Sequence, residues 1–434
     1  MLAIQKKLSN TFYALLSLPA TAMGFALCVQ IAALSWILNT KYGFSLEDIG
    51  LVWLAGPMAG IFGQVIIGLV SDKAWFWGGR RRPFILIGGT LAALMILALP
   101  NLDIIDSALG IDSIMTVALI VALTLDLSIN ISFNPTRSVI ADVTPLGEKR
   151  TRGYTIMQTV SGFFGVLAYL IGAFISNYTL IYIGAGIVFF FSIFPIFFIE
   201  EPRDLAADKV ALTEETAEGI AQKDTDITEF LKICLAHAFT WLGVQTMFVY
   251  SFAFVKTNIM GYGLQEELGQ DLNNEIGFGL GVAFAILNAV GFLLPATVLQ
   301  PVSERIGRVK THTICIAIMA IGYAALVFFG TTQISFFLLM AFVGIGWGAV
   351  VSLPFAIMSE VIDQRKMGLF MGLFNLSVVI PQIFASLLGG YLDGFDNQSI
   401  IFVISAISLA ISAGLWLLVK EQASSFKMAG GNTH

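Results

Sequence analysis

Charged side chains are scarce in this sequence. Asp, Glu, Lys and Arg together make up only 12% of the 434 residues, whereas hydrophobic residues make up 57%. The mean hydropathy is +0.85. A soluble domain of this size does not need so much apolar surface, and the apolar residues recur in runs of about 20, the length of a membrane-spanning helix. We therefore expect an all-α membrane protein that crosses the bilayer many times.

Cysteine is also scarce, and several catalytic patterns are missing. The three cysteines, Cys28, Cys234 and Cys315, lie inside apolar runs without metal-ligand spacing, so we expect buried thiols. The sequence has no nucleotide-binding glycine-rich loop, no cluster of metal ligands and no credible nucleophile triad. These absences argue against an enzyme, a metal, a resident cofactor and ATP-driven transport. The net charge of -6, without a basic patch, gives no reason to expect a nucleic-acid partner.

About twelve apolar segments are long enough to be membrane spans. They are residues 12–38, 47–70, 84–100, 113–135, 153–176, 179–199, 232–256, 277–299, 311–330, 334–358, 368–391 and 399–419. The fourth span is expected to continue as a helix beyond Pro135. If the N-terminus is cytoplasmic, every lysine and arginine except Lys41 and Lys256 falls on the cytoplasmic side. Basic residues collect on that side of membrane proteins, so both termini are predicted to be cytoplasmic.

The chain divides into two related halves. The polar segment 200–230 is predicted to be a cytoplasmic linker between an N-terminal half, 1–199, and a C-terminal half, 231–420, with a cytoplasmic tail at 421–434. An acid, a base and then Gly-Arg recur at equivalent places, in SDKAWFWGGRRRP after the second span and in PVSERIGRVK after the eighth. Parallel six-helix repeats of this kind are the build of the major facilitator superfamily. We therefore expect its fold, with a central cavity between the halves.

The fourth span carries an unusual polar face. Asp126, Asn130, Asn134 and Arg137 share one side of a helix that turns by about 100° per residue. A charged side chain in the bilayer costs about 3 kcal/mol on insertion scales. This face must therefore point at other helices or at a watery cavity. Two interpretations remain open, a lock between helices and a polar pathway for a substrate and a coupling ion.

The segment Trp53–Ile85 resembles the sucrose transporter group. The matching positions are Gln64, Gly68, Ser71, Asp72 and Gly79 to Ile85. Two departures are Val65, where the family usually has proline, and Lys73, where it usually has arginine. The fourth span also resembles this family, with Asp126, Asn130, Pro135, Arg137 and Asp142 in register and Asn134 in place of a glycine. Further matches are LNAV around Asn288 and the run MGLFMGLFNLSVVIPQIFASLLGG around Asn375 and Gln382. The chain is therefore similar to sucrose/proton symporters, within the glycoside-pentoside-hexuronide cation symporters.

This resemblance implies proton-coupled import of a disaccharide or related glucoside, such as sucrose or maltose, by alternating access. It also implies that Asp126 takes part in proton coupling and that Arg137 binds substrate. Protonation of Asp126 would remove its attraction for a nearby guanidinium and free Arg137 to donate to sugar hydroxyls. Eleven helical residues rise about 16 Å, too far for a direct pair along a straight helix. A kink at Pro135, a link through water or another span, and separate action all remain open.

Sugar recognition needs amide or acid hydrogen bonds and an aromatic face. The candidates, besides Arg137, are Gln30, Gln64, Asn130, Asn134, Gln158, Trp241, Gln245, Asn288 and Asn375. Each of them taken alone is also explained by a hydrogen bond between helices. Their spread over both halves favours a central polar cavity. His237 is expected to be a packed or interfacial histidine rather than a proton relay.

The loop after the second span resembles the cytoplasmic gate motif of the superfamily, in which an acid and arginines latch the halves. The gate candidates are Asp72, Arg80, Arg81, Asp142, Glu304 and Arg308. Glu360 is a further partner for such a latch. The arginines are also explained by the charge bias of cytoplasmic loops alone. We favour the gate because the loop lies outside the bilayer.

Other functions remain open from the sequence. The coupling ion is expected to be a proton, with a sodium-coupled or uncoupled sugar carrier as the alternative. A sugar sensor that does not transport is a different class, although about thirty linker residues are few for a signalling region. The expected partners are a small sugar and the lipid bilayer. Analogy with the superfamily favours a monomer, and the compact loops favour a bacterial inner membrane.

Overall fold

The computed structural model describes residues 7–61, 75–144, 148–201, 225–363 and 367–421. These residues form helices without a β-strand, and ten of the helices are long and apolar enough to cross a membrane. The shorter apolar helix Ile400–Trp416 matches the twelfth predicted span, and the second span lies partly outside the described residues. The predicted all-α membrane fold is therefore confirmed. Most of the predicted linker and tail lies outside the described residues.

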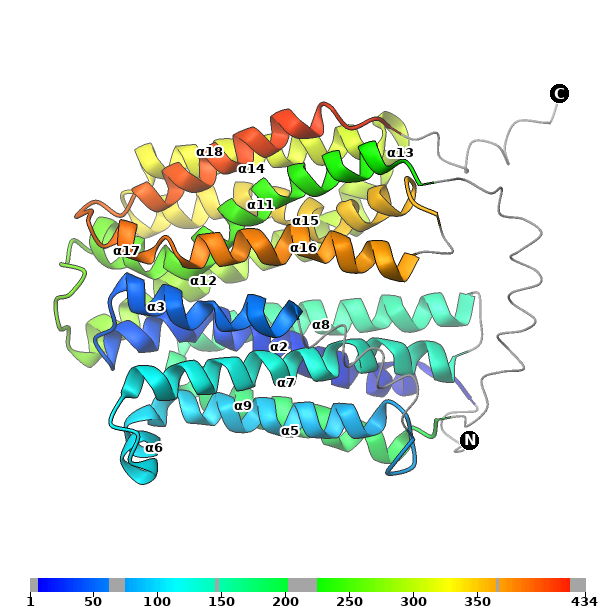
Figure 1. Cartoon of the computed structure of the whole chain (residues 1–434), viewed down its shortest axis with the longest axis horizontal. Coiled ribbons are helices and arrows are strands. Elements are labelled where there is room, and N and C mark those ends of the chain that lie inside the picture. Colours follow the sequence, from blue (N-terminus) through cyan, green and yellow to red (C-terminus); the bar gives the residue numbers. More distant parts are fainter. Residues whose placement is uncertain (1–6, 62–74, 145–147, 202–224, 364–366, 422–434) are drawn as a thin grey trace.

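The helices form two bundles that lie side by side with their long axes aligned (Figure 1). The first bundle contains α2 (Asn10–Thr40), α3 (Leu46–Trp53), α5 (Arg82–Ala98), α6 (Leu102–Leu109), α7 (Ile114–Val143), α8 (Glu148–Phe174) and α9 (Asn177–Ile193). The second contains α11 (Ile227–Phe254), α12 (Gln270–Leu294), α13 (Gln300–Ile306), α14 (Arg308–Phe329), α15 (Gln333–Ser359), α16 (Met367–Ser386), α17 (Gly389–Leu392) and α18 (Ile400–Trp416). We call these bundles the N-half and the C-half.

Short polar residues start many of these helices. Ser9, Ser113, Ser176 and Asp226 each accept a hydrogen bond from a backbone N–H in the first turn of the helix that follows. Such N-caps satisfy donors that the helix itself leaves without a partner. Isolated polar residues between long apolar runs therefore mark where the chain enters each span.

The fourth span continues through its proline, as predicted. Helix α7 runs from Ile114 to Val143 with Pro135 inside it. Asp126, Arg137 and Asp142 consequently stand on one continuous helix. The prediction of buried thiols is correct only for Cys315, because Cys28 and Cys234 are half-buried.

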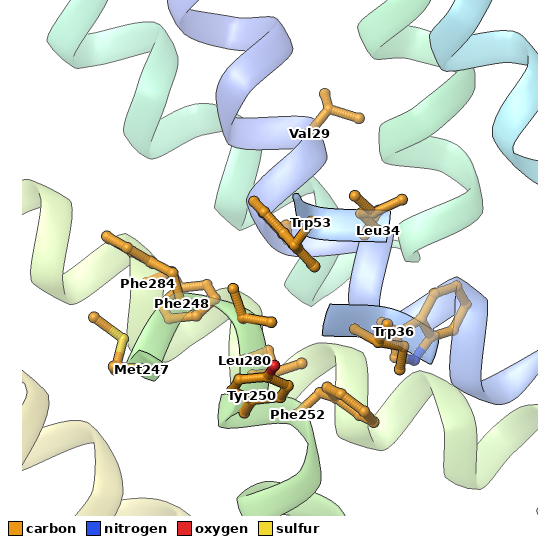
Figure 2. Close-up of a cluster of buried hydrophobic side chains, with 14 of the residues drawn as sticks. Val29, Leu34, Trp36, Trp53, Met247, Phe248, Tyr250, Phe252, Leu280 and Phe284 are labelled. Carbon is orange, nitrogen blue, oxygen red and sulfur yellow. The ribbon is translucent and has the colours of Figure 1, made fainter. Parts of the chain in front are cut away.

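An apolar core joins the two halves. Figure 2 shows Trp36 and Trp53 of the N-half in the same buried apolar cluster as Phe248, Phe252 and Phe284 of the C-half. Where helices cross most closely, glycine removes the side chain. A Cβ atom at Gly281 would lie 2.8 Å from the backbone oxygen of Tyr169 in the other half, and tight crossings of this kind are typical of membrane bundles.

The two ends of the molecule differ in charge. Helices α5 and α14 begin at one end, next to Arg80, Arg81, Arg82 and Arg308, and we call this the basic end. Helix α13 lies at this end in Figure 1, and α6 and α17 lie at the other end, which we call the latch end.

Candidate functional site

Asp126 is a buried carboxylate in the middle of α7. Its side chain is only 6% exposed, and Gln30 of α2 donates a hydrogen bond from Nε2 to Oδ2 over 2.9 Å. Gly56 lies beside the carboxylate, since a Cβ atom there would be in ordinary van der Waals contact with Oδ1 at 3.5 Å. Among the described residues, no cation pairs with Asp126. An ionised carboxylate is expensive to bury with one neutral partner, so this site favours the protonated acid unless water or a cation reaches it.

The polar face of α7 continues from Asp126 toward the basic end. Asn130 donates from Nδ2 to the backbone oxygen of Asp126 over 2.8 Å, and Asn134 is half-buried one turn further on. Asn130 also has a further contact. These amides therefore connect the buried acid to the exposed part of the same helix.

Arg137 does not pair with Asp126. Its guanidinium lies over the ring of Phe133, with 4.1 Å between Cζ and the ring centroid, and its side chain is exposed. Tyr154 of α8 donates from its hydroxyl to the backbone oxygen of Arg137 over 3.1 Å. Pro135 does not bring the two charges together. Asp126 and Arg137 thus make no direct pair, and the Arg137 guanidinium makes no hydrogen bond or ion pair with another described residue.

The C-half contributes an aromatic group with amides beside it. Trp347 of α15 donates from Nε1 to Oδ1 of Asn288 over 3.4 Å. The Trp347 ring centroid lies 6.2 Å from that of Trp241 and 5.3 Å from that of Phe248. Sequence reasoning named Asn288 and Trp241 but missed Trp347. Its signal was a single tryptophan between Gly346 and Gly348 in an otherwise apolar helix.

The other polar side chains considered in the C-half lie on α11 and α16. Gln382 donates from Nε2 to Oε1 of the buried Gln245 over 3.1 Å, which joins α16 to α11. His237 accepts a hydrogen bond from Nε1 of Trp241 over 2.9 Å and stacks on Phe374 at 4.8 Å. His237 is therefore packed, as expected.

Three predicted ligands remain isolated or undescribed. Asn375 is half-buried on α16 and Gln158 is exposed on α8, and neither makes a hydrogen bond with another described residue. Gln64 lies outside the described residues, as does the gate candidate Asp72.

At the basic end, the gate candidates form the same network in each half. Arg81 donates from Nε to Oδ2 of Asp142 over 3.2 Å, which ties the start of α5 to the end of α7. Arg308 pairs with Glu360 and ties the start of α14 to the end of α15. The repeated Gly-Arg motif thus occupies matching places in both halves. Both ion pairs lie within one half, so neither of them latches the halves together here.

Two acids that the sequence analysis did not single out complete this network. Glu201 accepts from the backbone N–H groups of Arg80, Arg81 and Arg82 over 2.8 to 3.1 Å. Glu421 accepts in the same way from Arg308, Val309 and Lys310 over 2.8, 2.9 and 3.4 Å. Each acid neutralises the positive end of a helix dipole. Their only sequence signal was an acid placed just after the last span of each half.

The two other gate residues have local roles in the structure. Glu304 accepts from Nε2 of Gln300 over 3.1 Å on the exposed helix α13. Arg80 is half-buried and gives its backbone N–H to Glu201. A gating role for these residues stays a prediction.

Comparison with known proteins agrees with this architecture. The profile of the Major Facilitator Superfamily matches residues 14–380 and 246–427. Similar curated proteins include the sucrose transport protein SUC4 of Arabidopsis thaliana, 24% identical over 79% of this chain and 76% of that protein. They also include the sucrose transport protein SUT3 of Oryza sativa subsp. indica, 24% identical over 99% of this chain and 96% of that protein. The resemblance to sucrose transporters that the motifs indicated is thus confirmed.

Solved structures show the same fold at lower identity. The D-xylose-proton symporter matches with a TM-score of 0.69 at 16% identity, over 95% of this chain and 99% of that chain. The nucleoside transporter NupG matches with a TM-score of 0.67 at 13% identity, over 95% of this chain and all of that chain. The protein therefore belongs to the Major Facilitator Superfamily, whose members are transporters and not enzymes.

Proposed function

We propose that this protein is a proton-coupled symporter that imports a disaccharide or related glucoside, with sucrose and maltose as the first substrates to test. The observation that carries the proposal is the burial of Asp126 against a neutral hydrogen-bond partner, Gln30, in the middle of a span. An acid in this position is stable when it holds a proton and is destabilised when it loses it. The similarity to sucrose transport proteins supports a sugar as the substrate.

Coupling depends on the side of the membrane with which Asp126 can exchange its proton. With the proton bound, Asp126 is neutral and the helices around it can close over the site. When the proton leaves toward the other side of the membrane, the carboxylate needs water or a cation, which favours an open conformation. Arg137 stands on the same helix, and the donors of its guanidinium make no hydrogen bond with another described residue. A bound sugar satisfies those donors, so substrate and proton together favour the closed, mobile form of the carrier.

The substrate site we propose lies between the halves and extends along α7 from Asp126 toward the basic end. The N-half offers Asn130 and Arg137 on α7, and the C-half offers Asn288 and Trp347 as an amide next to an aromatic face. Sugars present faces of C–H groups edged by hydroxyls. The aromatic ring binds the C–H face, and the amide and guanidinium groups bind the hydroxyls. Planar guanidinium and amide donors also suit neighbouring hydroxyl pairs.

We propose that the basic end faces the cytoplasm, because basic residues collect on that side. On this assignment the linker, the tail and both termini are cytoplasmic. The backbone of α3 rests on the backbone of α16 and α17 at the latch end, at Gly50 and Gly389. The structure would then be the conformation closed to the outside. We further propose a monomer in a bacterial inner membrane, as superfamily analogy and compact loops favour.

The direct test is uptake of labelled sucrose and maltose into proteoliposomes with an imposed inward proton gradient. We expect accumulation above the external concentration without sodium. One charge that crosses 100 mV carries about 2.3 kcal/mol, enough for roughly a fiftyfold gradient. Accumulation that requires sodium would replace the proton as coupling ion. Equilibration without accumulation would mean an uncoupled carrier, and the absence of uptake for these and other glycosides would refute transport.

A further inference from the structure

At the latch end, an acid of the C-half caps a helix of the N-half. Asp393, just after α17, accepts hydrogen bonds from the backbone N–H groups of Leu46 and Glu47, each over 3.0 Å. These two groups open α3 and have no acceptor within their own helix. Ser45 and Asp48 form a capping box, in which the Ser45 hydroxyl accepts from the backbone N–H of Asp48 and the Asp48 carboxylate accepts from the backbone N–H of Ser45. The remaining donors of the α3 N-terminus are thus satisfied by the other half of the molecule.

The surrounding contacts allow a close approach at this point. A Cβ atom at Gly389 would lie 2.1 Å from the backbone oxygen of Leu46, and one at Gly50 would lie 2.0 Å from that of Ser386. Tyr250 of α11 donates from its hydroxyl to the same Ser386 oxygen over 2.7 Å. Backbone therefore rests on backbone where α3 meets α16 and α17. Any side chain at either glycine would push the halves apart.

The nature of these contacts suits a joint that opens and closes. A carboxylate bound to helix amides is held by charge and by the helix dipole rather than by a buried apolar surface. Asp393 is half-buried and Glu47 is exposed, so water can take over both hydrogen bonds when the helices separate. At the basic end, in contrast, Arg81–Asp142 and Arg308–Glu360 each stay within one half.

We propose that Asp393 is a positioning residue of the transport cycle. Its carboxylate latches the N-terminus of α3 and holds this end of the transporter closed. The two hydrogen bonds break each time this end opens to take up substrate. This inference rests on the proposed function, because it assigns the residue to one step of alternating access. It concerns an interaction between the halves and not the sugar or the proton site.

The test measures opening of the latch end without any substrate. Spin labels at Ser107→Cys in α6 and Thr331→Cys before α15 stand on exposed positions of opposite halves at this end. The three native cysteines are replaced by alanine in this background. Distances between the labels are then recorded by double electron–electron resonance in lipid nanodiscs. A closed and an open end give a short and a long distance.

We expect Asp393→Asn to raise the ratio of long to short distances about tenfold, as the loss of a charged hydrogen-bond acceptor predicts. Asp396→Asn is the matched control, because this exposed acid three residues later makes no hydrogen bond with another described residue. It should leave the distances unchanged. Asp393→Glu should restore part of the closed population. Equal distance distributions in Asp393→Asn and the unmodified protein would overturn the latch.

A second pair of variants tests the donor side and does not depend on residue 393. Leu46→Pro removes one of the two N–H groups at the first helical position, where proline is tolerated. Ser45, with φ -67° and ψ 170°, has the extended backbone that a residue before proline prefers. Leu46→Ala keeps the N–H group and controls for the lost side chain. More opening in the proline variant than in the alanine variant supports the latch, and equal opening in both contradicts it.

The two proposals fail in different ways. If the distances respond as expected but no glycoside is transported, the latch stands and the proposed substrate is wrong. If sugar accumulates but neither Asp393→Asn nor Leu46→Pro changes the distances, transport stands and the latch is wrong. The readout in nanodiscs needs neither sugar nor a proton gradient, so it remains informative in both cases.

Discussion

Replacing Asp126 by asparagine separates coupling from binding more sharply than any other single change. The amide has nearly the same shape as the carboxylic acid, and its Oδ1 can still accept the 2.9 Å hydrogen bond from Gln30. The side chain is buried and has no cationic partner among the described residues, so its neighbours lose no ion pair. We therefore expect Asp126→Asn to fold and to bind sugar. It cannot carry a proton.

The expected magnitude is large. With one proton per sugar at 100 mV, the unmodified protein should accumulate sugar about fiftyfold. Asp126→Asn should equilibrate sugar to a ratio near one, while exchange of internal for external sugar continues. The assay is uptake and exchange of the same labelled sugar in the same proteoliposomes.

A matched acid on the same helix serves as the control. Asp142 is paired with Arg81 near the end of α7, so Asp142→Asn is expected to change the rate but not the final accumulation ratio, which coupling alone determines. Equal accumulation by Asp126→Asn and the unmodified protein would refute the role of Asp126. Loss of exchange as well as accumulation would show that this acid is needed for binding or for the conformational change.

Three further predictions concern binding and stability. Arg137→Lys should raise KM for sugar uptake about tenfold, because lysine lacks the planar donors, whereas Phe133→Leu should have a smaller effect since it removes only the ring beneath. Trp347→Ala should raise KM about fivefold by removing an aromatic face worth about 1 kcal/mol, and Trp347→Phe should restore most of it, with an unchanged KM contradicting the proposed site. Glu201→Ala should lower the melting temperature in detergent by a few degrees, because three amides lose their acceptor at a cost of about 1–2 kcal/mol. Glu201→Gln keeps an acceptor and should lower it less, so equal melting temperatures for all three proteins would count against the cap.

Features that depend on local pattern could be predicted from the sequence. Hydropathy located the spans, and the polar positions of α7 indicated that the helix continues through Pro135. The repeated Gly-Arg motif indicated the matching positions that Arg81 and Arg308 occupy. All of these follow from spacing along a helix or from a short motif that keeps its meaning in any surrounding.

Features that depend on distant neighbours could not be predicted in this way. Asp393 and Leu46 are 347 positions apart, and nothing near Asp393 indicates that its partner is the start of another helix. Glu201 and Glu421 carry no motif that distinguishes a helix cap from an ordinary surface acid. The lack of a direct pair between Asp126 and Arg137 could not be decided from the sequence, since the rise per residue alone does not exclude a kink at Pro135.

The paired caps at Glu201 and Glu421 have a consequence for biosynthesis. Each acid follows the last long helix of its half and caps the start of a helix in the same half, α5 or α14. The network around that helix is thus completed by a residue near the end of its own half. A ribosome that has released Glu201 has therefore released every group that the network around α5 requires. The N-half can then assemble in the membrane while the C-half is still being translated. Two separately synthesised polypeptides, divided within the polar segment after Glu201, should consequently recombine into one working carrier.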